Sequence, residues 1–344
     1  MLSQLLLRQA VAIDRGRLKE VKVAFIGSGG IASAHAQRLS KLESVKIAAC
    51  VDVDEKKAAV LSASYGATGY MDLDKMLKAE KLDAVYVCTP PFARGTEVRA
   101  IEMGIPVFFE KPVALTMERA TEIASALRKH GVVHSAGYMW RYLDVTDRAL
   151  EELRQSGPVG MAMGQYIDPF WFPRDHWWLY KDKGGGQVIE QSTHVFDLMR
   201  FLVGDVTGVA AEIDNLIIGK EVEHMTGEDF SIVMMRFKSG AMGVVCSSCA
   251  SQNTFLGTAV RIIAKKVALE HIGHARTLRI FKRDHIEEVR SQMDPLLEED
   301  KLFIEAVRTG DTSRIRSSFE DAMKTLEVTI AANRAASEKM VVDL

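Results

Sequence analysis

Short apolar runs alternate with amphipathic stretches between Val21 and about Trp140. Such runs are typical of strands that are buried on both faces of a parallel sheet. They lie at residues 21–26, 45–52, 82–89, 105–110 and 132–139. The stretches between them have helical character and lie at residues 31–42, 54–64, 94–103 and 116–130. This alternation predicts a doubly wound α/β domain.

The pattern changes after Trp140. A helix near residues 144–155 precedes strand-like segments at short spacing, namely 159–168, 206–216, 229–237, 241–250, 258–264, 266–272 and 276–282. Ser239–Gly240 and Gly273–His274 lie where hairpin turns would fall. Further helices are expected at 190–203, 296–308 and 318–337. The second half therefore predicts an α+β domain with a large, mostly antiparallel open sheet and helices on one face.

The length and charge of the chain narrow the class of protein. A chain of 344 residues has room for two ordinary domains. Its 44 Lys and Arg against 46 Asp and Glu lack the basic excess of proteins that bind nucleic acid or anionic membranes. No apolar run reaches the ~18 residues needed to span a bilayer, and four cysteines do not make a disulfide framework. We expect a cytoplasmic protein without nucleic-acid or membrane partners.

The segment Gly27-Ser28-Gly29-Gly30-Ile31-Ala32 fits the G-x-G-x-x-G/A fingerprint, and it follows a buried strand and opens a helix. Gly27 permits the tight turn, Gly29 lets the backbone approach a pyrophosphate, and Ala32 allows close packing of helix on strand. The helix N-terminus offers free N–H groups to the phosphates. Asp52 ends the second strand. Its carboxylate would accept hydrogen bonds from the adenosine ribose and repel a 2′-phosphate, so NAD is the expected cofactor.

Three motifs in the first half resemble the Gfo/Idh/MocA oxidoreductases: residues 23–32, Thr89-Pro90-Pro91 and Glu110-Lys111-Pro112. The Glu-Lys-Pro tripeptide after a strand is that family's most recognisable mark. In the second half, Gly184-Gly185-Gly186 followed by Glu190 and His194 resembles its second-domain motif, and residues 303–341 resemble its C-terminal end. The resemblance covers nearly the whole chain from about residue 20 onward.

This resemblance implies a two-domain enzyme with its active site between the domains. We divide the chain into an N-terminal extension (1–20), an NAD-binding Rossmann domain (21–141) and a substrate-binding and oligomerisation domain (142–344). Family members usually oxidise or reduce a hydroxyl or carbonyl of a sugar, cyclitol or related polyol, and commonly form dimers or tetramers through the second sheet. The residues expected to bind NAD are Gly27, Ser28, Gly29, Gly30, Ile31, Ala32, Asp52, Thr89, Pro90, Pro91, Glu110 and Lys111.

Two positions depart from the family pattern. Glu190 stands four residues before the histidine, where the family most often has aspartate, and Arg94 lies where many members have a histidine after the Thr-Pro-Pro turn. Both changes alter polar groups near the expected cleft. They bear on the substrate more than on the reaction type.

Lys111, Glu190 and His194 are the candidate catalytic residues, and we expect all three to contact substrate as well. Lys111 follows a strand, and the carboxyl ends of parallel strands face the ligand crevice. Its ammonium group can stabilise negative charge on a reacting oxygen. His194 is the expected proton carrier, because histidine titrates near neutrality. If residues 190–194 are helical, Glu190 lies on the same face and can orient the imidazole or bind a hydroxyl. This chemistry requires no metal.

Three further residues are candidates for substrate binding. Arg141 lies at the domain junction, where hinge packing is an equal alternative. Asp197 follows His194 by three residues, close to the same helical face. Trp171 belongs to an aromatic segment at 169–178 that could cover a sugar ring, anchor an oligomer or pack in the core.

Two other functions remain open beside the dehydrogenase. Some members of the family hold NAD as a redox relay and cleave glycosidic bonds without net turnover of the cofactor. A non-catalytic nucleotide sensor on the same scaffold would be expected to have lost Lys111 or His194, and both are present. Sequence does not determine the substrate, the carbon oxidised, the direction of reaction or the choice between dimer and tetramer.

Overall fold

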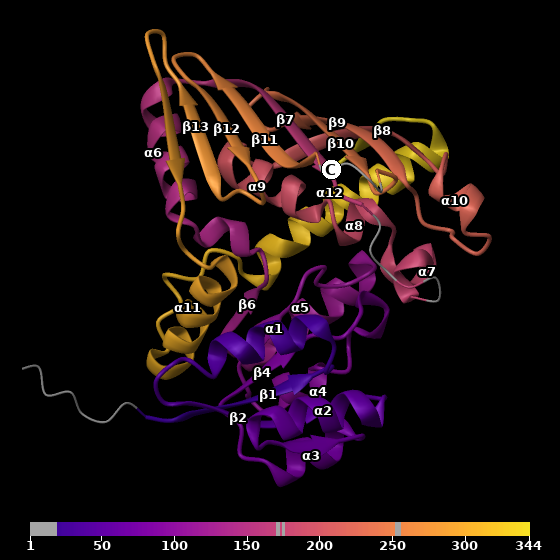
Figure 1. Ribbon diagram of the computed structural model, residues 1–344, viewed down its shortest axis with the longest axis vertical. Coiled ribbons are helices and arrows are strands. Elements are labelled where there is room, and N and C mark those ends of the chain that lie inside the picture. The colour runs from indigo at the N-terminus through magenta and orange to yellow at the C-terminus, as the bar shows by residue number, and fades with distance from the viewer. Residues whose placement is uncertain (1–18, 170–172, 174–175, 252–255) are drawn as a thin grey trace, which may run out of the picture.

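The computed structural model describes residues 19–169, 173, 176–251 and 256–344. These residues form two units built on separate sheets, one above the other in Figure 1. The lower unit has a parallel sheet of six strands, and the upper unit has a mostly antiparallel sheet of nine. The predicted fold class, a Rossmann domain joined to an α+β domain with a large open sheet, is therefore confirmed. Among the described residues, no helix combines the length and apolar character that crossing a bilayer requires.

The first sheet has the strand order β3-β2-β1-β4-β5-β6, with parallel pairing throughout. Its strands are β1 (Val21–Ile26), β2 (Val45–Val51), β3 (Thr68–Tyr70), β4 (Ala84–Val87), β5 (Val107–Phe109) and β6 (His134–Ala136). Its helices are α1 (Gly30–Leu39), α2 (Glu55–Tyr65), α3 (Leu73–Ala79), α4 (Val98–Glu102) and α5 (Met117–His130), with a 3-10 turn η1 (Pro91–Ala93). This order reverses between β1 and β4, and ligands of such sheets bind at that point.

The five predicted strands of this half correspond to β1, β2, β4, β5 and β6. The edge strand β3 and helix α3 were not predicted. Thr68 and Gly69 in β3 are exposed, so that strand lacks the apolar run on which the prediction depends. The helix expected from residue 94 begins only at Val98, because η1 occupies the turn before it.

The second sheet has the order β14-β13-β12-β11-β7-β10-β9-β8-β15, and only β7 and β10 pair in parallel. Its strands are β7 (Val159–Ile167), β8 (Val206–Asp214), β9 (Phe230–Phe237), β10 (Met242–Ser248), β11 (Gly257–Ala264), β12 (Ala268–Ile272), β13 (Thr277–Phe281), β14 (Ile286–Arg290) and β15 (Val342–Asp343). Strands β14 and β15 were not predicted. The first is an edge strand and the second has two residues, so neither shows an apolar run.

Helices cover the face of this sheet that looks toward the Rossmann unit (Figure 1). The main ones are α6 (Asp144–Ser156), α9 (Thr193–Val203) and α12 (Phe319–Glu338). The other helical elements of this half are η2 (Met139–Tyr142), η3 (Trp177–Leu179), α7 (Lys181–Gly184), α8 (Gln187–Glu190), α10 (Ile218–Glu221) and α11 (Pro295–Thr309). The helix predicted at 190–203 is broken, because α8 ends at Glu190 and α9 starts at Thr193. Glu190 and His194 therefore lie on different helices, and the predicted one-helix arrangement is wrong.

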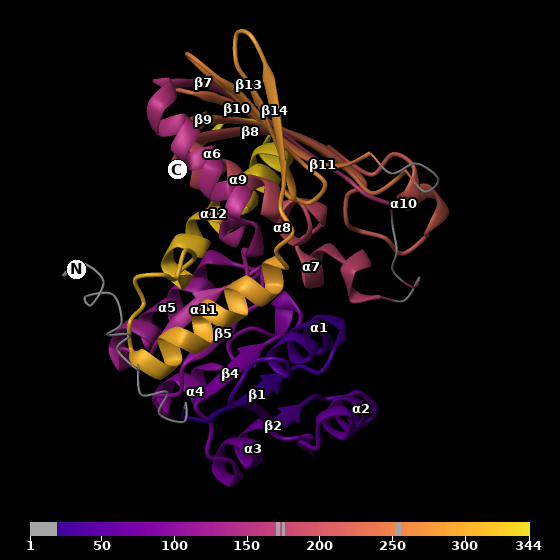
Figure 2. The same cartoon turned by 60° about the vertical axis from the view of Figure 1, so that its left-hand side comes forward.

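The C-terminal helices return to the Rossmann unit (Figure 2). Phe303 and Ile304 of α11 are buried in the core beneath α1, and Phe319 and Leu326 of α12 are buried against β5 and α5. Residues after 142 thus complete the packing of both sheets. The predicted boundary at 141–142 stays a prediction, as does the extension at 1–20, of which residues 1–18 lie outside the described part.

Candidate active site

The glycine-rich turn leaves β1 at the point where the sheet order reverses. Gly27 has a φ of +92°, and a Cβ atom there would lie 2.8 Å from the backbone of Cys88 and Thr89. Only glycine satisfies both the positive φ and the close approach to the end of β4. The turn is therefore fixed by packing within the Rossmann sheet.

Helix α1 begins directly after this turn with its N-terminal N–H groups unoccupied by a side chain. Gly29 is the N-cap residue and makes no side-chain capping bond. Space is open above Gly29 and Gly30, where an added Cβ would meet nothing within 4 Å. The buried Ser28 hydroxyl also has no hydrogen-bond partner among the described residues. Free N–H groups, open space and an unpartnered hydroxyl fit a bound pyrophosphate.

Asp52 follows β2 beside this turn, and its carboxylate is held by two backbone groups. Oδ2 accepts the N–H of Ser28 at 2.7 Å, and Oδ1 accepts the N–H of Asp54 at 2.9 Å. Each oxygen keeps a lone pair for a further donor. A fixed carboxylate next to the glycine turn suits the ribose hydroxyls of NAD, so the described donor set fits that cofactor.

Arg94 joins the two loops that follow β4 and β5. Its buried guanidinium donates to the carbonyl oxygens of Val87 at 2.9 Å and Glu110 at 2.6 Å, and to the Thr89 hydroxyl at 3.2 Å. Burial lowers the pKa of Arg94, although neighbouring Glu97 opposes the shift. Arg94 therefore holds Thr89-Pro90-Pro91 against Glu110-Lys111-Pro112. The residue that departs from the pattern noted above is thus a structural link between the two loops.

Lys111 reaches from the end of β5 to the second unit. Its Nζ lies 2.8 Å from both the Oε1 and the main-chain oxygen of Glu190, and both side chains are mostly buried. The other carboxylate oxygen of Glu190 accepts the indole N–H of Trp178 at 2.9 Å. Two predicted catalytic residues from different units are thus brought into direct contact, and Trp178 fixes the orientation of the carboxylate.

His194 lies in the first turn of α9, with its ring stacked on Trp140 at a centroid distance of 5.0 Å. Burial, followed by the positive charges of Lys111 and His274, holds the pKa of His194 well below its ordinary value. The imidazole is therefore neutral at neutral pH. Its Nδ1 has no hydrogen-bond partner among the described residues. A neutral imidazole close to Lys111 is able to accept a proton.

Sequence reasoning missed three polar residues that border His194 and Glu190. His274, in the β12–β13 turn, lies 6.0 Å from the ring of Trp140 and 3.9 Å from the Asp168 carboxylate. Burial, then the charges of Asp168 and Glu190, raise the pKa of Tyr166. One oxygen of buried Asp168 has no hydrogen-bond partner among the described residues. In the sequence, these residues could have been found only from where they lie. Tyr166 and Asp168 lie at the end of a predicted strand, and His274 lies in the predicted hairpin turn at 273–274.

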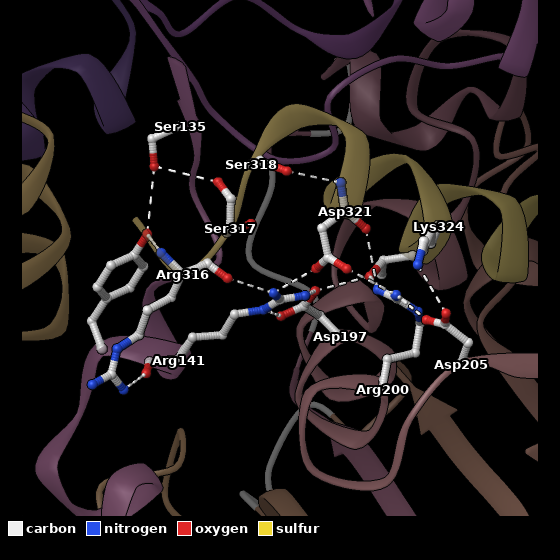
Figure 3. Close-up of polar contacts among 12 residues, drawn as sticks. Ser135, Arg141, Asp197, Arg200, Asp205, Arg316, Ser317, Ser318, Asp321 and Lys324 are labelled. Atoms are coloured by element: carbon white, nitrogen blue, oxygen red, sulfur yellow. Dashed lines mark hydrogen bonds and ion pairs between the residues drawn. The ribbon is translucent and has the colours of Figure 1, made fainter. Parts of the chain in front are cut away.

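Arg141 and Asp197, two predicted substrate-binding residues, bind each other (Figure 3). The Arg141 guanidinium binds both oxygens of Asp197 at 2.7 and 2.5 Å, and it also binds Asp321 at 2.6 Å. The Asp197 carboxylate further accepts the Thr325 hydroxyl at 2.8 Å. Both side chains are about 2% exposed. Their predicted contact with substrate stays a prediction, and the observed contacts join η2, α9 and α12. Trp171 lies outside the described residues.

The N-terminal unit is an NAD-binding Rossmann domain, since residues 21–138 match the family described as an oxidoreductase family with an NAD-binding Rossmann fold. Residues 148–270 match the GFO/IDH/MocA C-terminal domain. The chain therefore belongs to the Gfo/Idh/MocA family of oxidoreductases, as the resemblance implied.

Relatives match over almost the full chain. A myo-inositol 2-dehydrogenase of Thermotoga maritima is 26% identical over 343 residues, covering 94% of this chain and 98% of the relative. A D-apiose dehydrogenase of Paraburkholderia graminis is 26% identical over 369 residues, covering 98% and 93%. The solved structure of a levoglucosan dehydrogenase with NADH and levoglucosan has a TM-score of 0.85 at 19% identity, covering 94% of this chain and 99% of that one. This last likeness concerns the fold.

Proposed function

We propose that this protein is an NAD-dependent dehydrogenase or reductase that acts on a hydroxyl or carbonyl carbon of a sugar, cyclitol or related polyol. The observation that carries the proposal is the contact between Lys111 and Glu190 at 2.8 Å, beside the buried neutral His194 and at the carboxyl end of the Rossmann strands. The curated names of two relatives, an inositol dehydrogenase and an apiose dehydrogenase, support the substrate class.

Each side chain of the site has a separate role in the proposed reaction. Bound NAD supplies the hydride acceptor or donor at its nicotinamide. The Lys111 ammonium donates to the reacting oxygen and stabilises the negative charge that develops there. The neutral imidazole of His194 takes up the hydroxyl proton when the substrate is oxidised, and the imidazolium so formed returns the proton in the reverse direction. Glu190 and Trp178 keep the ammonium group in place.

The polar group formed by Tyr166, Asp168 and His274 has the chemistry to recognise further hydroxyls. One buried oxygen of Asp168 has no partner among the described residues, and the Tyr166 phenol is able to donate or accept. A substrate hydroxyl satisfies the buried acceptor, and an analogue without it leaves that atom unpaired, which a hydrogen-bonding pocket penalises strongly. We assign these three residues to substrate selection, together with the three catalytic candidates.

The direct test is NADH formation with the purified protein over a panel of aldoses, cyclitols, sugar acids and glycosides. Wild-type protein and a Lys111→Met variant are assayed side by side. We expect at least one polyol to yield NADH with the wild type and hardly any with the variant. Glycoside cleavage without net NADH formation, in a protein that binds NAD, would instead support the redox-relay alternative.

Cofactor choice is predicted to depend on Asp52. Asp52→Ser removes the carboxylate that would face the ribose while leaving an acceptor for nearby backbone N–H groups. We expect the affinity for NAD to fall by about tenfold, corresponding to one charge-assisted hydrogen bond, and discrimination against NADP to weaken. Fluorescence titration with NADH and NADPH measures both values. Asp54→Ser is the matched control, since that carboxylate caps α2. Unchanged preference for NADH in Asp52→Ser would contradict the assignment.

We also propose a homodimer or homotetramer formed through the outer face of the nine-stranded sheet. Large apolar side chains are exposed in adjacent positions of this face, with Met242 and Ile263 each paired in register with Met161. On the neighbouring strand, Ile232 and Met234 are 54% and 58% exposed. An apolar patch of this kind marks an interaction surface. A symmetric pair would bury it against its own copy.

Charge placed in this patch is expected to separate the subunits. The double substitution Ile232→Lys and Met234→Lys should convert the oligomer to monomers because burying two unpaired ammonium groups is costly. Light scattering after gel filtration gives the mass. Val60→Lys, at an apolar residue of α2 that is 69% exposed in the Rossmann unit, is the control. An oligomer that survives the double substitution would place its interface elsewhere.

A cytoplasmic location remains our proposal as well. Its support is that all four cysteines, Cys50, Cys88, Cys246 and Cys249, are free thiols, as is usual in reducing compartments.

A further inference from the structure

His35 lies at the centre of a buried polar cluster beneath the Lys111 loop. It projects from α1, has no exposed surface, and faces a carboxylate on each side of its ring. Nδ1 is 2.8 Å from Oδ1 of Asp300 on α11, and Nε2 is 2.8 Å from Oε1 of Glu110 at the end of β5. The ring therefore connects the nucleotide-binding helix, the C-terminal part of the chain and the Glu-Lys-Pro motif.

Two ionised carboxylates at hydrogen-bond distance require a proton on each ring nitrogen, because an ionised carboxylate only accepts. Burial alone would lower the pKa of His35, but the charge and hydrogen bond of Asp300, followed by those of Glu110, outweigh it and raise the pKa well above its ordinary value. The rings of Tyr86 and Phe108, at centroid distances of 5.4 and 5.1 Å, keep the imidazole in this plane.

A metal ion is the alternative occupant of this cluster. Potential ligand atoms of His35, Glu110 and Glu299 all lie within 4.8 Å of one another. Both ring nitrogens of His35 already face oxygen atoms, however, so coordination would require breaking one of these short contacts. Burial, opposed by His35 and assisted by Glu110, holds the pKa of Glu299 well above its ordinary value, which disfavours the ionised form that a metal ion needs. An imidazolium between two carboxylates is consistent with these contacts without any ion.

Glu110 contacts both the His35 ring and the backbone of Lys111. Its second oxygen, Oε2, accepts the backbone N–H of Lys111 at 3.1 Å, and its main-chain oxygen is held by Arg94. A Cβ atom on residue 137 would lie 2.9 Å from Oε1, so the glycine there leaves the space that the carboxylate occupies. The direction in which Lys111 leaves the strand is thus set by the Glu110 carboxylate, and through it by His35.

We propose that His35 is a positioning residue for Lys111: a buried imidazolium that clamps Glu110 against Asp300 and so aims the lysine at Glu190 and the reacting oxygen. This inference rests on the proposed function for the role of Lys111, and it adds a residue that touches neither substrate nor reacting atoms. A displacement of about 1 Å at a reacting group is enough to cost on the order of a hundredfold in rate.

The protonation state is tested by ¹⁵N NMR of the histidine rings in the NAD-saturated protein at about pH 8, where a histidine with a pKa near 6.5 is neutral. The His35→Gln variant assigns the resonance. We expect both ring nitrogens to be protonated. A neutral ring, or a resonance that shifts on treatment with a chelator, would overturn the proposal. The titratable groups that face the ring are Tyr86 from β4, Glu110 from the end of β5, and Glu299 and Asp300 from α11.

The positioning role is tested by steady-state kinetics of His35→Gln and, in case that variant does not fold, of Glu110→Gln. The His35 ring donates from both nitrogens, and the Glu110 carboxylate accepts with both oxygens. Glutamine at either position cannot reproduce this arrangement. We expect kcat to fall about tenfold to a hundredfold in either variant, while in His35→Gln KM and the Kd for NAD change by less than about threefold. His134→Gln is the control, since His134 also pairs with a carboxylate, Glu320, but lies beside Val107 at the start of β5, at the other end of that strand from Lys111.

The outcomes separate the two hypotheses. If the wild type turns over no polyol, the proposed function fails, while the NMR result still decides the state of the ring. If the wild type is active and folded His35→Gln keeps its kcat, or loses kcat only in proportion to its affinity for NAD, His35 does not position Lys111.

Discussion

Lys111→Met is expected to lower kcat by about 10² to 10⁴-fold, the range typical for loss of a group that assists proton transfer or stabilises a developing charge. Methionine keeps the length of the side chain and removes the ammonium group. The reacting oxygen then loses its cationic partner, and Glu190 keeps only the Trp178 indole. Lys111 is only one of the residues expected to contact NAD, and most of the others lie along the glycine-rich turn, so the Kd for NAD should change much less than kcat. Kinetics with the best polyol and NADH fluorescence titration give the two values.

Two further variants define the source of this effect. Lys111→Arg keeps the positive charge but spreads it over a planar fork that is not equivalent to the compact ammonium. We expect it to recover a small part of the activity. Lys129→Ala, at an exposed lysine of α5 in the same unit, is the surface control and should behave as wild type. A Lys111→Met variant with more than about a tenth of the wild-type kcat would remove Lys111 from the reaction.

The features predicted well from sequence were those that depend on a local pattern. The turn at Gly27 and the acid at Asp52 follow from a strand, a turn and a helix that are close together in the chain. The contact between Lys111 and Glu190 was anticipated only as proximity, because 79 residues separate them and two units must dock to join them. The order of the motifs was enough to place Lys111 and Glu190 at one cleft. It could not show which of their atoms are in contact.

The residues that were missed or redirected depend on tertiary structure. Asp168 and His274 approach each other because β7, β11 and β12 pair in a register that no local pattern contains. Arg141 carries the same charge whether it binds substrate or Asp197, so its sequence position left both outcomes open. The break between α8 and α9 likewise arises where Ser192 meets Ser247 of β10 at 2.7 Å, a contact invisible to helical periodicity.

Arg141→Met is expected to reduce the free energy of unfolding by about 3–5 kcal/mol, the usual effect of removing one partner of a buried ion pair. The guanidinium is 2% exposed and binds Asp197 through two nitrogens. Burial would lower the pKa of Arg141, but Asp197 and then Asp321 outweigh it and raise the pKa. The guanidinium is therefore charged at every pH at which the protein is folded. Without it, the Asp197 carboxylate remains buried with Thr325 as its neutral partner. Urea titration measures the change.

A double variant tests whether the cost arises from the orphaned charge or from lost packing. Replacing buried ion pairs by apolar groups of similar volume is often neutral or stabilising, so Arg141→Met with Asp197→Leu should be more stable than Arg141→Met alone. Arg314→Ala, at an exposed pair with Glu305, is the control and should change stability little. If the double variant is no more stable than the single one, the main role of Arg141 is to hold η2 and α12 together through Asp321 and the Arg316 carbonyl. Retention of NAD binding by the folded double variant would then show that the junction, rather than the cofactor site, depends on this arginine.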